Sequence, residues 1–286
     1  MDKNSNENME IETQPFVDLV GQDIVSFIAD HAPTKVVTRF ARSLDHYSRA
    51  PRLKGIDEEM GAIRLIAGEE ELVVAIFEWL KLKEDQFPEH KDFVRKFKSH
   101  VVKMSFYPVL SQFRFILADM LKDGFTLEGL EGIVNWTAKP VVDGKNIRLV
   151  LFKEDGSELI RLNPLSNDIS HGDVHGKEVV PLLLNDFIEH VKDQSNITPK
   201  GYLGARADFR NKLLYATDAG SIRMEQSLEE LIEIFKPAYH DLLWVLAILI
   251  GSEVSSKKWG LVSQFIALYR EVLILAGVLP AGNIDD

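Results

Sequence analysis

Two segments near the C-terminus are apolar around the whole circumference of a helix, and they restrict the fold more than any other feature of the sequence. They are residues 242–250 and 272–279. A helix without a polar side must be covered on all sides. One domain of this size can enclose one such helix at its centre, so the second also predicts a subunit interface, and we expect an oligomer. The longer run, residues 242–250, is too short for a bilayer span of about 20 residues, so no membrane partner is expected.

Most of the remaining chain has the apolar spacing of amphipathic helices. A different pattern occurs at residues 139–162, where Asp143-Gly144 and Asp155-Gly156 are turn signals around β-rich segments. Strands do not alternate with helices along the chain, which argues against a parallel-sheet nucleotide fold. We therefore predict a mainly α-helical bundle with a β-hairpin or small meander inserted around residues 139–162. Predicted helices cover residues 16–32, 34–50, 57–85, 89–102, 105–121, 177–194, 203–217, 227–250 and 255–278, and residues 195–204 are predicted to form a loop.

Several local signals make these predictions specific. Ser227 and Glu230 form a capping-box pattern at the start of the helix that runs to residue 250, and Pro237 should kink or split that helix. Gly61 and Gly68 lie seven residues apart on one face of the long helix that Asp57 opens, which predicts close helix packing there. The glutamates of that helix are expected on its solvent side: Glu58, Glu59, Glu69, Glu70 and Glu71.

Composition limits both the compartment and the chemistry. Residues 1–14 are polar and lack the apolar core of a secretory signal, so they predict a disordered tail and a cytoplasmic protein. A helical domain over residues 15–125 and a second over 126–286 are expected to follow, or one continuous unit. The sequence contains no cysteine, which excludes disulfides, thiolate metal ligands and thiol nucleophiles.

The charge balance bears on nucleic-acid partners. A net charge of −11 disfavours duplex DNA, which requires a broad basic face, and leaves RNA open. Residues 91–103 form a basic cluster, and Phe93 and Phe97 lie alongside its charged residues. It predicts a surface for RNA or an acidic partner, or else an outer charged face with the aromatic rings turned into the core. Its charged residues are Lys91, Arg95, Lys98 and Lys103.

The string HGDVHG at residues 171–176 is similar to the metal motif of calcineurin-like metallophosphatases. No downstream segment supplies the other ligands of that family, and no buried strand precedes the string. His171, Asp173 and His175 would hold a single metal only on a helix, which Gly172 and Gly176 disfavour, so a polar turn is the preferred interpretation. Motifs for zinc proteases, nucleophile elbows and phosphate loops are absent from the sequence. We therefore expect neither a metal nor a cofactor.

Two short segments resemble the motif of HEPN-family proteins, Arg-Asn-x-x-x-His at a helix start. In residues 165–172, Asn167 and His171 match and Ser166 replaces the arginine. In residues 208–216, Arg210 and Asn211 match and Tyr215 replaces the histidine. The resemblance implies a helical bundle that commonly dimerises. In active members the histidine acts as acid or base and the arginine holds the scissile phosphate of a metal-independent ribonuclease.

Because neither segment carries the whole motif, our leading hypothesis is an assembly component with a degenerate HEPN-like fold that acts by protein–protein contact. A defence or toxin-type assembly is implied only by the resemblance. The first alternative is a ribonuclease that uses His171 with Arg210, supported by Asn167 and Asn211. The second is an adaptor that binds RNA or an acidic partner through residues 91–103.

Overall fold

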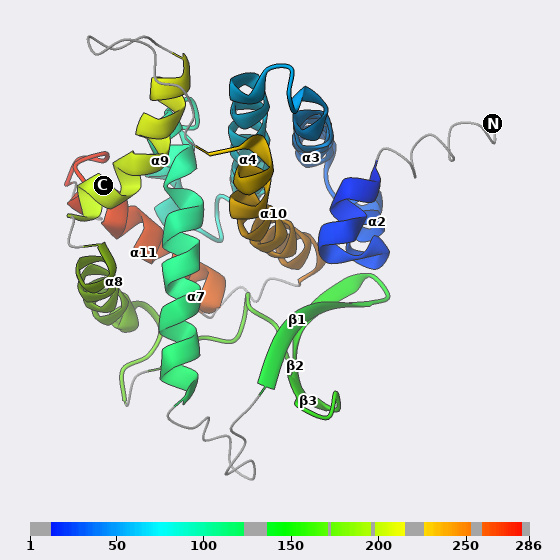
Figure 1. Ribbon diagram of the computed structural model, residues 1–286. Helices are drawn as coiled ribbons and strands as arrows, with labels where there is room; N and C mark the ends of the chain where they lie inside the picture. The colour runs from blue at the N-terminus through cyan, green and yellow to red at the C-terminus, as the bar shows by residue number, and fades with distance from the viewer. Residues whose placement is uncertain are drawn as a thin grey trace. The chain divides into compact units, whose positions relative to one another are not determined.

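The computed structural model describes residues 13–122, 136–170, 173–195, 198–214, 226–252 and 259–281. Helices make up most of this structure, and one three-stranded antiparallel sheet accompanies them (Figure 1). The predicted fold class, mainly α with a small β insertion, is therefore confirmed.

The chain forms two compact units, each built from two separate stretches. The first unit combines Met1–Leu82 with Ala205–Ile250, and the second combines Lys83–Gly204 with Gly251–Asp286. In this division the chain returns to the first unit at Ala205, and the expected domains stay a prediction.

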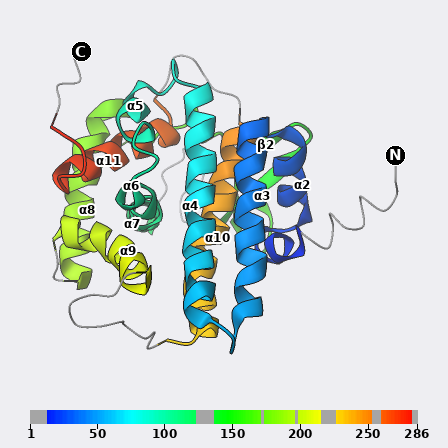
Figure 2. The same ribbon diagram turned by 90° about the horizontal axis from the view of Figure 1, so that it is seen from above.

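The first unit is a layer of long helices. A helix over residues 13–20 is followed by α2 (Gln22–His31), α3 (Thr34–Arg49), α4 (Glu58–Leu82) and α10 (Leu228–Gly251), with the 3-10 helix η1 (Ala50–Leu53) between α3 and α4. Figures 1 and 2 show α3, α4 and α10 side by side. The single helix expected over residues 16–32 is divided at Gly21, whose φ of 89° lies in the left-handed region that a helix cannot accommodate.

Close packing between α4 and α10 explains the paired glycines. A Cβ atom added at Gly61 would lie 2.5 Å from the side chain of Leu228, and one added at Gly68 would overlap the hydroxyl of Tyr239. That hydroxyl donates a hydrogen bond of 2.6 Å to the carbonyl oxygen of Leu65. The prediction of close helix packing at Gly61 and Gly68 is confirmed.

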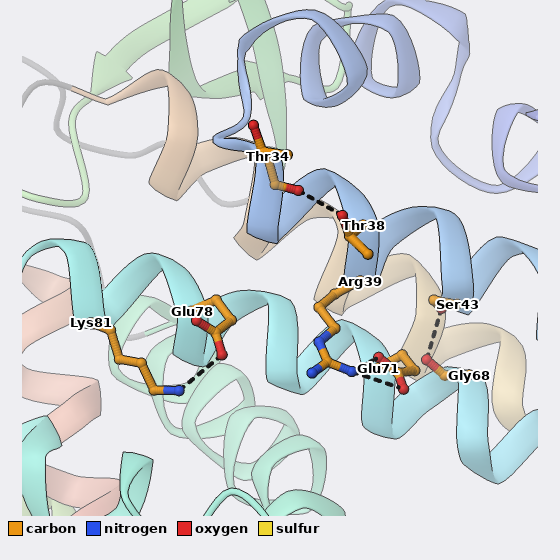
Figure 3. Close-up of polar contacts among 8 residues, drawn as sticks. All are labelled: Thr34, Thr38, Arg39, Ser43, Gly68, Glu71, Glu78 and Lys81. Atoms are coloured by element: carbon orange, nitrogen blue, oxygen red, sulfur yellow. Dashed lines mark hydrogen bonds and ion pairs between the residues drawn. The ribbon is translucent and has the colours of Figure 1, made fainter.

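The prediction that the glutamates of α4 lie on its solvent side is partly wrong. Glu69 is 0% exposed and Glu70 is 6% exposed, so these two side chains are buried rather than turned to solvent. Glu71 is half-buried, and its carboxylate pairs with Arg39 of α3 at 3.0 Å. One turn away, the hydroxyl of Ser43 donates to the carbonyl oxygen of Gly68 at 2.7 Å. Figure 3 shows both contacts along the seam between α3 and α4.

The start of α10 agrees with the sequence, and its interior excludes one of the two outcomes predicted for Pro237. The backbone N–H of Ser227 donates to the Glu230 carboxylate at 2.8 Å, and the N–H of Glu230 donates to Ser227 Oγ at 3.3 Å. This reciprocal pair is the predicted capping box. The helix is not split at Pro237, because it continues as one element to Gly251.

Helix α10 is also relevant to the membrane prediction. Within the described ranges, it is the one helix with the length and apolar composition to cross a membrane, with a mean hydropathy of 1.4 and 56% burial over its most apolar window. The central helix of a folded unit has the same composition, and α10 packs against α4 in the first unit.

The second unit is organised around α11 (Leu261–Leu275), ten of whose residues are buried. Helices α7 (Phe106–Lys122) and α8 (Val180–Ser195) contact it. Aromatic rings line the contact with α7: Phe106 packs edge-on against both Phe265 and Tyr269. Each apolar helix thus packs within its own unit, while Leu275 near the end of α11 stays 48% exposed. Oligomerisation stays a prediction.

The sheet is a meander in the order β1 (Trp136–Asp143), β2 (Asn146–Lys153) and β3 (Glu158–Leu162), and it confirms the β insertion. Asp143 pairs with Asn146 across the first turn, where Gly144 has a φ of 61°. At the second turn, Gly156 has a φ of 80°, and the Asp155 carboxylate accepts from the N–H of Ser157 at 2.9 Å. Both turns fall at the Asp-Gly pairs that predicted them.

Two other predicted elements are wrong. Residues 195–204 were expected to be a loop, but α9 (Pro199–Leu214) begins there, with Thr198 Oγ1 accepting from the N–H of Gly201 at 3.2 Å. Proline at the first helical position needs no partner for a missing N–H, so Pro199 starts this helix rather than breaking it. The single helix expected over residues 89–102 is instead divided into η2 (Pro88–His90), α5 (Lys91–Val94) and α6 (His100–Met104).

Candidate functional site

The loop at residues 163–176 carries the first half-motif and most of the HGDVHG string. It is not a helix start, because its described residues adopt turns and extended backbone up to η3 (Gly176–Val179). Asn163 organises its first part: its side-chain oxygen accepts from the N–H of Leu165 at 3.1 Å. Asn167 closes the turn in return, since its Oδ1 accepts from the N–H of Asn163 at 2.8 Å.

The loop caps the N-terminus of α11. Gly260, at the N-cap position, offers no side chain to the first N–H groups of the helix. The carbonyl oxygen of Asn167 accepts from the N–H of Leu261 at 2.7 Å, and that of Pro164 accepts from the N–H of Val262 at 3.1 Å. A Cβ atom at Gly260 would lie 2.5 Å from the backbone of Leu165, so only glycine allows this approach.

Gln264 of α11 holds the other end of the loop. It is fully buried, its Oε1 accepts from the N–H of Ile169 at 2.9 Å, and its Nε2 donates to the carbonyl oxygen of Ile169 at 2.8 Å. A third hydrogen bond of 3.0 Å joins Nε2 to the carbonyl oxygen of Gly176. One side chain therefore fixes the loop on both sides of residues 171 and 172.

The structure describes some of the four candidate catalytic residues and leaves others out. Asn167 serves the loop and α11, as described above. Asn211 lies exposed on α9. The backbone of Arg210 lies on the same helix, but its side chain is outside the described residues. The whole of His171 is also outside the described residues. The proposed approach of His171 to Arg210 therefore stays a prediction.

The interpretation of HGDVHG as a polar turn is consistent with the part that is described. Asp173 lies in a turn, His175 has extended backbone, and Gly176 has a φ of 58°. The N–H of Gly176 donates to the carboxylate of Asp168 at 3.2 Å. Within the described ranges, no three His, Asp or Glu side chains converge as metal ligands would.

The basic segment 91–103 does not present one stripe. A turn over residues 95–98 separates α5 from α6, so Lys91, Arg95, Lys98 and Lys103 do not share a helix face. Lys91 Nζ lies 3.4 Å from the carboxylate of Glu84. Lys103 also interacts with another group of the protein. Phe93 is fully buried, with its ring edge-on to Tyr269. The interpretation with aromatic residues turned into the core therefore fits Phe93.

A second basic surface, on α3 and η1, went unnoticed in the sequence. Residues 34–54 hold six Lys or Arg and one Asp, a net charge of +5 within a chain of −11. The detectable signal is a spacing of seven residues between Lys35, Arg42 and Arg49, which puts them on one face of a helix. The exposed cations of this surface, called here the α3 basic face, are Lys35, Arg42, Arg49 and Arg52.

His46 lies beside this face. Burial lowers its pKa below the usual value, and the positive charges of Arg64 and Arg42 act in the same direction, against the carboxylates of Asp45 and Glu71. Four cations on or beside this face form no ion pair with any residue that the structure describes: Lys35, Arg42, Arg52 and Arg64. Their positive charge is thus not neutralised within that part of the chain.

Three other groups whose pKa values are shifted, Tyr47, His90 and Tyr269, are buried in the cores and are held in their neutral forms. Burial raises the pKa of Tyr269, whose hydroxyl donates to the carbonyl oxygen of Val102, and it raises the pKa of Tyr47 to about 12. Burial also lowers the pKa of His90 to about 4. None of these three groups has the pKa of a general base that works near neutral pH.

Comparison with known proteins does not place the chain in a family: no protein-family, curated protein or solved structure was found to match it.

Proposed function

We propose that the protein acts by contact, as a component of a protein assembly, and that its contact surface is the corner at residues 53–60, between η1 and α4. The observation that carries the proposal is the exposure of Ile56. Its side chain is 79% exposed, the largest fraction among the large apolar side chains that the structure describes, and Met60 is 42% exposed. Contiguous exposed apolar patches mark interaction surfaces, and we infer that Ile56 and Met60 form the centre of one.

The corner is fixed rather than loose, so Ile56 is held outward. The carbonyl oxygen of Leu53 accepts from the N–H groups of Ile56 at 3.0 Å and Asp57 at 2.9 Å. Asp57 in turn caps α4, its carboxylate accepting from the N–H of Met60 at 3.0 Å. A contact residue that is already ordered loses less conformational entropy when it binds.

The Glu58 carboxylate ties the corner to the start of α10. One of its oxygens accepts from the N–H of Gly55 at 3.3 Å, and the other accepts from the N–H of Leu228 at 3.1 Å. An ion pair between Lys54 and Glu229 lies beside it. An apolar centre within a charged rim is the arrangement found in protein interfaces.

The partner that we propose for this corner is a second copy of the chain, so the test is self-association. Sedimentation velocity over a wide range of protein concentration should show a reversible oligomer for the wild type. Ile56→Ser should weaken association by about tenfold, which corresponds to about 1.4 kcal/mol. Ile234→Ser is the matched control, since Ile234 is 51% exposed on α10 of the same unit. A wild type that stays monomeric throughout, or equal effects of the two substitutions, would contradict the proposal.

The same proposal expects no ribonuclease activity. The described part of the half-motif, Asn167, is engaged in the structure of its loop, and Ser166 and Tyr215 stand where the HEPN-like motif has arginine and histidine. Mixed RNA incubated with the protein in EDTA should remain intact on a denaturing gel. Cleavage that persists in EDTA and is lost in His171→Ala would favour the ribonuclease instead.

A further inference from the structure

The charge of this acidic chain is distributed unevenly, and α3 with η1 is its most basic part. The exposed cations of the α3 basic face, Lys35, Arg42, Arg49 and Arg52, follow one side of α3 and continue into η1. At 1.5 Å per residue, residues 35–52 span about 25 Å, and the cations at 35, 42 and 49 are about 10 Å apart.

Most of these cations are unneutralised within the described part of the chain. Arg49 pairs with Asp45 at 2.7 Å, and Arg39, at the edge of the face, pairs with Glu71. Lys35, Arg42 and Arg52 have no such partner there. Arg64 of α4 adds a fourth cation near His46, as its effect on the pKa of that histidine indicates.

The residues between the cations identify the kind of partner. Thr38 and Ala41 are the exposed neighbours, so the face offers no large apolar side chain to anchor a protein. The aromatic residues of α3, Phe40 and Tyr47, are 3% and 7% exposed, so the helix offers no ring on which an unpaired base could stack. What remains is a row of cations with small side chains between them, which matches phosphates.

We propose that the α3 basic face binds the phosphate backbone of a nucleic-acid duplex, without reading its sequence. A duplex presents one phosphate per about 1.7 Å of its axis, so cations along about 25 Å of helix can each meet one. The net charge of −11 lowers the overall affinity. It does not abolish binding, because charges farther away than about 10 Å are screened at moderate salt. This inference is independent of the contact corner at residues 53–60.

The test is binding of a fluorescein-labelled DNA duplex to the full chain, followed by fluorescence anisotropy over a series of salt concentrations. The double variant Arg42→Gln/Arg52→Gln should weaken binding by at least about tenfold at low salt. It should also make the slope of log K against log salt shallower by about 2, because each phosphate contact contributes about 0.9.

The matched control removes two charges from the other basic segment, through Arg95→Gln/Lys98→Gln. Both of these residues are exposed, so the change in net charge is the same, and affinity and slope should stay close to those of the wild type. An equal loss in the two double variants would mean that net charge governs binding, which overturns the proposal. So would a wild type that binds an acidic peptide but not the duplex.

A second readout reports on position. A phosphate seated at Arg42 would offset one of the two positive charges that lower the pKa of His46, so duplex binding should raise that pKa. An NMR titration of the His46 ring protons, with and without a saturating duplex, measures this shift. An unchanged pKa in the saturated complex would show that the phosphates bind elsewhere, and the proposal would fail.

Discussion

At the scale of single residues, several polar side chains that resemble functional groups are engaged in holding the backbone. Gln264 makes three hydrogen bonds to the loop at residues 163–176, and Asn167 closes a turn while its carbonyl oxygen caps α11. Buried polar groups of this kind cost free energy when a partner is removed, because the remaining group stays out of water.

Replacement of Gln264 tests this role. Gln264→Leu keeps the approximate volume but leaves the N–H of Ile169 without its acceptor, so we expect a loss of about 2–3 kcal/mol in the free energy of unfolding. Urea denaturation followed by circular dichroism measures the loss. Gln14→Leu, at an exposed position, should change stability by less than about 0.5 kcal/mol. A Gln264→Leu protein as stable as the wild type would contradict the assigned role.

Buried His90 predicts a pH dependence of stability. Its folded pKa of about 4 lies below the ordinary value of 6.5, so the unfolded chain binds the proton more tightly. His90 therefore destabilises the fold progressively as the pH falls from about 6.5 towards 4, and it has no such effect above pH 7. His90→Phe should reduce the loss of stability between pH 7 and pH 5, as measured by urea denaturation. The same loss in both proteins would exclude His90 as the cause.

At the scale of elements, the contact between α4 and α10 depends on the absence of side chains. Gly61 and Gly68 let Leu228 and Tyr239 approach the backbone of α4. In an open helix position, alanine would be more stable than glycine by about 1 kcal/mol. The close approach of Tyr239 reverses the sign of this effect at Gly68.

Gly68→Ala should therefore destabilise the protein by about 1–3 kcal/mol, because the new methyl group overlaps the Tyr239 hydroxyl and displaces it from its bond to Leu65. Thermal and urea denaturation measure the change. In a double-mutant cycle with Tyr239→Phe, which removes the hydroxyl, most of the cost of Gly68→Ala should disappear. An increase in stability on Gly68→Ala alone would show that α10 is not held this closely.

At the scale of the whole molecule, the two units are interleaved along the chain. Each takes its most apolar helix, α10 or α11, from the last third of the sequence. The N-terminal stretch of each unit consequently exposes apolar surface when its helix is missing.

A fragment of residues 1–220 should therefore fail to fold, because it keeps α9 but lacks both α10 and α11. We expect weak near-ultraviolet circular dichroism and rapid amide exchange throughout the fragment. Coexpression with residues 221–286 should restore the native spectrum, which serves as the control for expression and solubility. A fragment with cooperative unfolding of its own would contradict this view of the units.

Signals that act over a few residues were enough to predict many parts of the fold. The capping box at Ser227 and Glu230, the Asp-Gly turns of the meander and the paired glycines of α4 each depend on neighbours along the chain or on one helix face, and each is present as expected. Their physical basis is local hydrogen bonding and side-chain volume, and both can be inferred from the residue types alone.

The tertiary structure decided the rest, because burial depends on what covers a residue. Glu69 and Glu70 follow the polar side of a helix pattern, but both side chains are buried. The loop at residues 163–176 takes its conformation from α11, about 90 residues further along the chain, and no local pattern encodes that contact. The arrangement of the two basic segments was decided in the same way: a turn divides residues 91–103, whereas Lys35, Arg42 and Arg49 lie on one continuous helix, α3.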